Sequence, residues 1–276
     1  MPEDIGGDYR ALNGRVDSIL ATFDLQLAAL LAKAQIRTSL KMRRLLTVED
    51  DGTIRPTVAN IKALRQLPKL FRDSLSAEGY DGLVTGFLAS FNGGLPRMEK
   101  ILGKIAKAYA LVPPTFTAAD KAFFDALKQN TALNLEAAID LVSQSARQST
   151  MFSVGGTSYE EMAVQLAGKL HIALGQAESV AVTGISTFYR TIAAQGFQQI
   201  EESGKPLAYT YYGPLDVLNR PLCRELEEAA RSGKTWTKVE IDRMNNGQIP
   251  DVFTTCGGYR CRHQWIVALD KGKPLW

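Results

Sequence analysis

Cysteine and histidine are scarce in this sequence: its 276 residues include 3 cysteines and 2 histidines. Three cysteines are too few for the disulfide framework on which small secreted domains depend. The first residues, Met1 to Asp8, are acidic and lack the basic flank and apolar stretch of a secretory signal. We therefore expect synthesis in a reducing cytoplasm, where structural disulfides are not expected.

The chain also lacks long apolar runs and a strong excess of one charge. No uncharged apolar run approaches the roughly 18 to 20 residues of a membrane-spanning helix, which excludes a transmembrane protein. There are 32 Lys and Arg against 29 Asp and Glu, a net charge of +3, which is too small for the basic face of a dedicated nucleic-acid binder. No Gly-x-Gly-x-x-Gly follows a predicted strand, so nucleotide binding has no support.

The overall composition, with 45% hydrophobic and 22% charged residues, is that of a globular protein. The length is about 1.8 times a typical domain of about 150 residues. Rare residues are unevenly distributed, because all three cysteines and all three tryptophans lie after residue 204. We therefore divide the chain near residues 203–206 into a first region, 1–204, and a second region, 205–276.

The first region has the features of a helical protein. It contains no proline between Thr115 and Lys205, and its apolar residues recur at spacings of three and four. This spacing predicts a long helix over residues 9–46 and a second helix from Thr57, with Pro68 as a kink or break. The apolar stripe of the long helix comprises Leu12, Val16, Ile19, Phe23, Leu27 and Leu30.

Capping and first-turn residues mark further helix starts at Pro96, Thr117 and Ser158. We expect six or seven helices, arranged as long hairpins or a bundle, and no strand in this region. Four glycines, Gly168, Gly175, Gly184 and Gly196, interrupt the last predicted helix. They favour close helix packing, and the alternative is a membrane-active segment over residues 171–189.

The second region predicts a small α+β module. Leu207–Tyr212 has the aromatic and β-branched content of a strand, and Tyr259–Leu269 is expected to form a closing strand. Between them, Pro221 suits the first residue of a short helix, and Thr237 with Glu240 forms a capping box for another. The predicted fold is thus mainly α, with long helices followed by a small α+β module that a zinc ion could stabilise.

The chemical signal of the chain is a group of three cysteines and one histidine: Cys223, Cys256, Cys261 and His263. Thiolates and imidazoles in this number are the ligands of a tetrahedral zinc ion. An extended backbone would place Cys261 and His263 on one face, and Gly257 with the next glycine would supply the turn that returns Cys256 to them. These four residues are the predicted metal ligands.

Other interpretations of the same residues stay open. The cysteines could be buried reduced thiols with His263 oriented towards the backbone, or two of them could form a disulfide. A cysteine nucleophile paired with His263 is a further alternative. The other histidine, His171, falls on a predicted helix, where a packed or surface position is expected.

Three segments of the second region resemble a known family: Asp216–Cys223 (DVLNRPLC), Ser232–Trp236 (SGKTW) and Gly257–Trp265 (GGYRCRHQW). They are similar to the C-terminal signature of tailed-bacteriophage minor head proteins, the Mu F-like head-morphogenesis group. The resemblance covers the second region only. The residues that fit the signature are Asp216, Arg220, Pro221, Cys223, Gly233, Lys234, Cys261 and Arg262.

The sequence departs from the family pattern in two places. Leu218 and Asn219 replace an Arg-Thr pair, so any polar contact made there by the family is in doubt. The family's histidine appears here as Cys256, and its last cysteine appears as His263. The total ligand set is unchanged by this exchange, which metal coordination tolerates and a disulfide does not.

The resemblance implies a low-copy virion structural protein without enzymatic activity, attached at the portal vertex and active in head assembly. Its implied partners are the portal protein and other capsid or neck proteins, with non-specific contact to packaged DNA, and it is expected to be oligomeric in the particle. Synthesis would take place in the cytoplasm of the bacterial host. Whether the protein leaves with the genome stays open.

We further expect Asp216 and Arg220 to form an internal ion pair in this module. Four aromatic residues, Tyr211, Tyr212, Trp236 and Trp276, are either anchors for a partner or core residues. Two other functions stay open: an enzyme or toxin delivered by the particle, using Cys223 or Cys261 with His263, and a membrane-active ejection protein.

Overall fold

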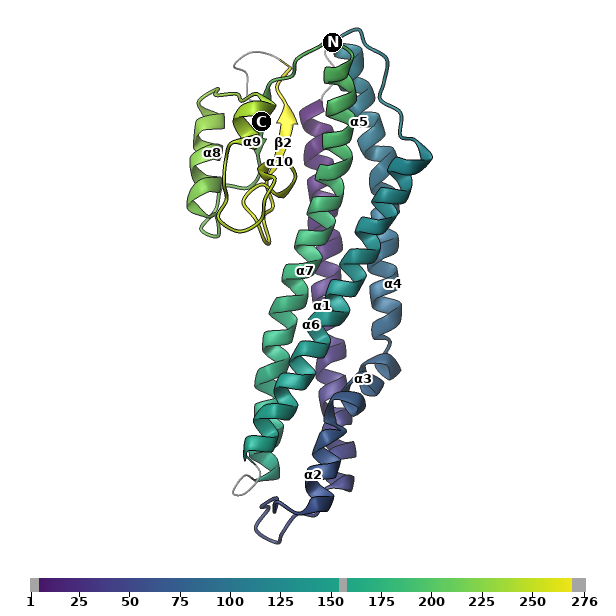
Figure 1. The fold of residues 1–276 in the computed structure, drawn as a ribbon, viewed down its shortest axis with the longest axis vertical. Coiled ribbons are helices and arrows are strands. Elements are labelled where there is room, and N and C mark those ends of the chain that lie inside the picture. The colour runs from purple at the N-terminus through teal and green to yellow at the C-terminus, as the bar shows by residue number, and fades with distance from the viewer. Residues whose placement is uncertain (1–4, 154–157, 270–276) are drawn as a thin grey trace. The chain divides into compact units, whose positions relative to one another are not determined.

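The chain is dominated by α-helices (Figure 1), in a computed structural model that describes residues 5–153 and 158–269. The described part of the first region contains seven α-helices and no strand, as predicted. The helices are α1 (Ile5–Leu45), α2 (Val58–Arg65), α3 (Leu67–Glu78), α4 (Tyr80–Ser90), α5 (Gly94–Ala108), α6 (Ala118–Ser153) and α7 (Tyr159–Glu202), with a 3-10 turn, η1, at Phe91–Gly93.

The helix starts lie where the capping residues predicted them. The hydroxyl of Thr57 accepts a hydrogen bond from the backbone N–H of Asn60 at 3.1 Å and caps α2. Pro68 lies in the first turn of α3, so it separates two helices instead of kinking one. Thr117 before α6 and Ser158 before α7 both form reciprocal capping contacts with the acidic residue three positions later.

The contacts divide the chain into two compact units. The first comprises the described residues of Met1–Ile19, Leu88–Thr131 and Ser179–Trp276, and the second comprises Leu20–Phe87 and Ala132–Glu178. The helices α1, α6 and α7 each contribute residues to both units.

In the second unit, apolar residues of α1 meet those of α3 and α4. Phe23 and Phe87 approach to 4.4 Å between ring centroids, and Leu27 and Phe71 are buried. A buried asparagine, Asn60, orders the turn after α1, because its side chain accepts from the N–H of Thr47 and donates to the carbonyls of Thr47 and Arg55. Such a side chain replaces the missing backbone partners of a turn.

In the first unit, glycines bring helices into close contact. A side chain at Gly94 would overlap the ring of Tyr189, and one at Gly196 would lie 2.3 Å from a methyl carbon of Leu102. The predicted role of the α7 glycines is therefore confirmed for Gly196 and also for Gly184, which packs against a threonine side chain. Gly168 has nothing within 4 Å, so close packing does not explain it.

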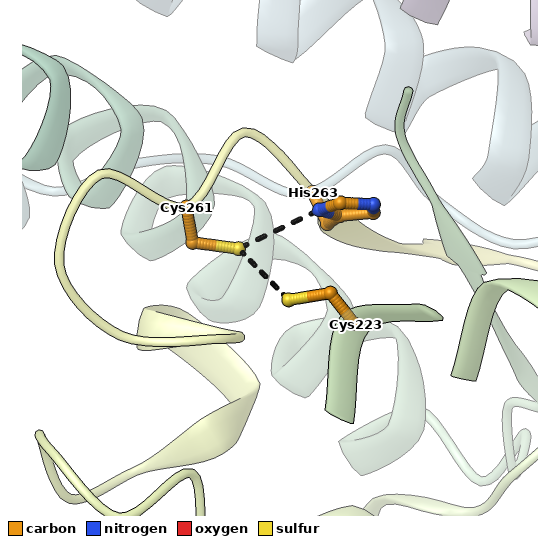
Figure 2. A group of neighbouring side chains, drawn as sticks. All are labelled: Cys223, Cys261 and His263. Carbon is orange, nitrogen blue, oxygen red and sulfur yellow. Dashed lines mark hydrogen bonds between the residues drawn. The ribbon is translucent and has the colours of Figure 1, made fainter. Parts of the chain in front are cut away.

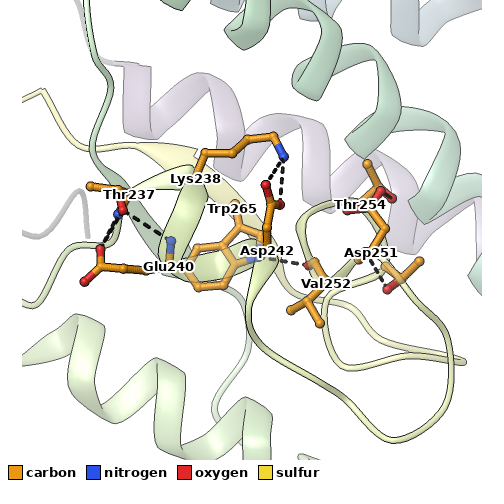
Figure 3. A network of polar contacts seen from close by, with 9 residues as sticks. Thr237, Lys238, Glu240, Asp242, Asp251, Val252, Thr254 and Trp265 are labelled. Atoms are coloured by element: carbon orange, nitrogen blue, oxygen red, sulfur yellow. Dashed lines mark hydrogen bonds and ion pairs between the residues drawn. The ribbon is translucent and has the colours of Figure 1, made fainter.

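The second region forms the predicted α+β module. Its strands β1 (Tyr209–Tyr212) and β2 (Gln264–Val267) pair antiparallel, with Tyr211 opposite Trp265. Its helices are α8 (Pro221–Arg231), α9 (Lys238–Asp242) and α10 (Val252–Thr255). Figure 3 shows the capping box of Thr237 and Glu240 at the start of α9 and the Trp265 indole, which donates to the carbonyl of Val252 at 3.1 Å.

One expectation for this module needs correction, and one open alternative is decided. The closing strand is shorter than predicted, because Arg260 has a φ of 58° and the chain turns before it becomes extended at Gln264. Tyr211 and Trp236 are core residues, at 0% and 4% exposure, and not surface anchors. Tyr212 is partly exposed, and Trp276 lies outside the described residues.

The module packs in the same compact unit as parts of α1 and α7. Gln264 donates to the side chain of Asn13 at 3.1 Å, the N–H of Arg260 donates to the Thr183 hydroxyl at 3.0 Å, and the Phe197 ring lies 5.6 Å from that of Tyr209. The predicted division near residue 204 coincides with the end of α7, yet the core continues across it.

The first helix, α1, passes a test for membrane spans. It is the one helix in residues 5–153 and 158–269 with an 18-residue window apolar enough to cross a membrane, at a mean hydropathy of 1.4. The lack of an uncharged apolar run therefore does not exclude a membrane-spanning helix, because a window that passes this test can contain up to two charged residues. Core helices of soluble proteins pass the same test, but they are mostly buried, whereas 28% of this window is buried.

The glycine contacts yield a stability prediction. Gly196→Ala is expected to lower the free energy of unfolding by about 1 to 3 kcal/mol, because the added methyl group overlaps the buried side chain of Leu102. Urea titration followed by far-ultraviolet circular dichroism measures this change. The control is Gly14→Ala in the same unit, where nothing lies within 4 Å and alanine should stabilise the helix by about 1 kcal/mol. Equal effects at both positions would contradict the packing argument.

Candidate metal centre

Three of the four predicted ligands meet at one point of the module (Figure 2). Cys223 lies in the first turn of α8, and Cys261 and His263 lie in the segment that leads into β2. The two sulfur atoms are 3.8 Å apart, and the Cys261 sulfur is 3.7 Å from Nδ1 of His263. All three residues are buried, and their ligand atoms lie within 4.8 Å of one another. They form a group close enough to bind a metal ion, which we call the Cys2His group.

These separations match the geometry of a tetrahedral site. With metal–sulfur bonds of about 2.3 Å and metal–nitrogen bonds of about 2.05 Å, a tetrahedral angle requires about 3.8 Å between two sulfurs and about 3.6 Å between sulfur and nitrogen. The observed 3.8 Å and 3.7 Å agree with both values. Two of the three separations therefore match a tetrahedral ion, and the third, between Cys223 and His263, lies within 4.8 Å.

The Cys261 sulfur is prepared to carry a negative charge. It accepts a hydrogen bond from the backbone N–H of Gly257 at 3.2 Å. Hydrogen bonds from Cys223, Cys256 and His263, in that order, lower the pKa of Cys261 below its usual value. The same contact with Cys261 raises the pKa of Cys223, and burial raises the pKa of Cys256. These contacts favour the thiolate form of Cys261, which is the form that ligates metals.

The surroundings hold these ligands in place. The ring of Tyr211 stacks on His263 at 5.0 Å with 7° between planes, and its hydroxyl lies 3.5 Å from the Cys223 sulfur. On the other side of His263, a side chain at Gly213 would lie 2.4 Å from the imidazole ring. A side chain at Gly257 would lie 2.1 Å from the Cys223 sulfur. Glycine is thus required at both positions by close approach of the backbone.

Cys256, the fourth predicted ligand, is fully buried but does not belong to the Cys2His group. Its backbone has a φ of 52° and a ψ of −119°, which is unfavourable for any residue with a side chain. Asp251 and Arg260 in the same loop also have positive φ. The loop therefore holds a strained shape that brings Gly257 and Cys261 to the group, and Cys256 contacts Cys261 without joining the group.

A buried arginine on α7 connects this loop to the helices. The Arg190 guanidinium donates to the carbonyls of Thr254, Thr255 and Cys261, and the residue is 6% exposed. Burial alone would lower the pKa of Arg190, but the nearby thiol groups of Cys256 and Cys261 raise it. The arginine therefore compensates negative charge on the sulfur cluster.

Arg190 was not predicted as a site residue, although a signal existed. It is the sole charged residue between Glu178 and Glu201, in an otherwise uncharged stretch of the helix. A charged side chain can be buried at such a position when other buried groups pair with it or hydrogen-bond to it. Sequence reasoning could not name those partners, because they lie more than 60 residues later in the chain.

The signature residues Asp216, Arg220 and Arg262 form contacts other than those predicted. Asp216 pairs with Arg262, and the predicted ion pair with Arg220 is wrong. The hydrogen bond from Arg262 lowers the pKa of Asp216. Arg220 instead donates to the carbonyls of Gly257 and Tyr259, because the loop before Cys261 presents unpaired carbonyls to it.

The remaining signature residues shape α8. Pro221 is its first residue, Gly233 has a φ of 91° just after its end, and the Lys234 ammonium lies 5.2 Å from the centroid of the Trp236 ring. These three residues therefore set the start of the helix that carries Cys223 and the turn that ends it.

A cavity of about 360 Å³ opens beside the Cys2His group. All three members of the group line it, and Cys256 does not. Its other lining residues are Val182, Leu218, Asn219, Arg220, Arg260 and Arg262. The ligands therefore face a space bordered by three arginines.

The group suits a metal ion, and the Cys261 sulfur and His263 nitrogen are also close enough for a nucleophile and its base. Cys261 is 4% exposed, whereas catalytic thiols lie in partly exposed sites. His171, the other histidine, is exposed on α7 and far from this chemistry in sequence.

Comparisons of this chain with protein-family models, curated proteins and solved structures found no match.

The Arg190 contacts yield a second prediction. Arg190→Met should destabilise the first unit by about 2 to 4 kcal/mol, because it leaves buried carbonyls unpaired and removes the compensating charge. Urea titration followed by tryptophan fluorescence measures this loss, since every tryptophan lies in the second region. The urea midpoint of Arg190→Lys should fall between those of wild type and Arg190→Met. Arg224→Met, on the exposed surface of α8, should leave the midpoint unchanged. Similar midpoints for Arg190→Met and wild type would refute the role of this residue.

Proposed function

We propose that this chain is a structural protein of a tailed-bacteriophage head, a minor head protein of the Mu F-like kind that acts at the portal vertex during head assembly. The observation that carries the proposal is the convergence of the signature residues. Cys223, Cys261, Arg220 and Arg262 come from segments separated by more than 30 residues and meet around one cluster.

The contacts of these residues support a structural role for the signature. Arg220 and Asp216 bind backbone and side-chain groups of the module itself, and the Cys2His group is buried. Polar groups of a motif that bond to other groups of the same module maintain its fold. Such a motif is expected in an assembly protein, whose function lies in its surfaces.

The second unit supports an assembly role because it exposes large apolar side chains on long helices. The exposed fraction is 74% for Leu25 and 71% for Val164, and exposed apolar residues are expected where subunits pack laterally. Within α1, α6 and α7 of this unit, these residues are Leu25, Ile36, Leu40, Leu45, Leu133, Leu141, Val164 and Ile172.

We further propose that the metal of the Cys2His group is zinc. Two thiolates and an imidazole at tetrahedral spacing are the ligand set that zinc prefers among common ions. A bound ion would tie α8 to the segment before β2 and so stabilise the module.

The assembly proposal is tested in particles of the phage that encodes this chain. Quantitative peptide mass spectrometry of purified DNA-filled heads should find the protein at a copy number equal to or below that of the portal protein. Cross-linking should then connect it to portal, neck or capsid proteins. Complete absence from both procapsids and filled heads would refute the proposal.

The zinc proposal makes use of the two histidines of the chain. The purified protein should contain about one zinc per chain by atomic emission, and His263→Ala should lose it because the site then has two ligands. His171→Ala is the matched control and should keep its zinc, since this residue is exposed on α7. Equal metal content in both variants would contradict the assignment.

A further inference from the structure

We infer that the metal held by Cys223, Cys261 and His263 keeps its fourth coordination position open to the adjacent cavity, where it binds an oxyanion such as a phosphate or carboxylate group. This inference rests on the metal site proposed above. It goes further, because it assigns a ligand-binding site to the module in addition to a structural one.

The geometry leaves one side of the group open. The backbone of Gly257 closes one side, since a side chain there would meet both sulfurs at 2.1 and 3.2 Å. The Tyr211 hydroxyl closes another, 3.5 Å from the Cys223 sulfur and 3.7 Å from the Cys261 sulfur. All three ligand residues line the cavity of about 360 Å³, so the fourth position of a tetrahedral ion faces this space.

The charges around this space favour an anion. Two thiolates neutralise a divalent ion, while the buried Arg190 adds a positive charge, and Arg220 and Arg260 line the cavity. Of the neighbouring carboxylates, Asp216 pairs with Arg262, and Glu227 pairs with Arg231. Arginine side chains beside an open metal position are the arrangement in which guanidinium groups and a metal together bind phosphate or carboxylate oxygens.

The competing arrangement is a closed site with Cys256 as the fourth ligand. Cys256 is buried and contacts Cys261, but it does not belong to the Cys2His group and does not line the cavity. The two arrangements differ in the number of sulfur ligands. An open site has two sulfurs, one imidazole nitrogen and one oxygen, whereas a closed site has three sulfurs and one imidazole nitrogen.

X-ray absorption spectroscopy of the zinc-loaded full chain counts these ligands without any substitution. Two sulfurs, one imidazole and one oxygen are expected. Three sulfurs would overturn the inference while leaving the metal site intact, and a chain that binds no metal would overturn both. The Cys256→Ala variant should keep the wild-type metal content, whereas Cys223→Ala should lose the metal.

Cobalt(II) in place of zinc then reports on the open position through its visible absorption bands. Inorganic phosphate or acetate should shift these bands in a saturable titration, and an unchanged spectrum with both would overturn the inference. Arg260→Asn, which suits the positive φ of this position, should weaken binding about tenfold without altering the anion-free spectrum. Arg224→Asn, on the exposed face of α8, is the matched control and should bind as wild type does.

Discussion

The structure of the first unit depends on how one buried positive charge is accommodated. Arg190 lies in the apolar part of α7, where an unpaired guanidinium would be costly, and it is stabilised by three backbone carbonyls of the module and by the nearby sulfur cluster. Because the carbonyls belong to the strained loop before β2, the same contact holds Cys261 in position. Helix packing, loop shape and site chemistry are therefore coupled through one side chain.

The site shows how a short chain segment can prepare ligands for a metal. Glycine at position 257 lets the backbone approach both sulfurs, and its N–H donates to Cys261, which stabilises a thiolate before any ion arrives. The stacked Tyr211 orients His263. Since these ligands are already ordered, metal binding would cost less conformational entropy than it does in a site that folds around its ion.

Much of the secondary structure could be predicted from local sequence. Capping at Thr57, Thr117, Ser158 and Thr237 marked helix starts correctly, because a cap depends on residues only three positions apart. The membership of three ligands in one group also followed from residue types. The ion pair of Asp216 did not, because the choice between two arginines depends on the path of the loop between them.

The sequence by itself determined that this protein is mainly helical, that its cysteines and one histidine lie in a small α+β module, and that these residues have metal-binding chemistry. Periodicity, caps and residue types are local properties, so they can be recognised in the sequence before the fold is known. The tertiary structure alone decided that Cys256 lies outside the Cys2His group, that Arg190 supports the loop, and that a cavity opens beside the group. These features depend on contacts between segments that are distant in the chain. Local sequence patterns do not predict the geometry of such contacts.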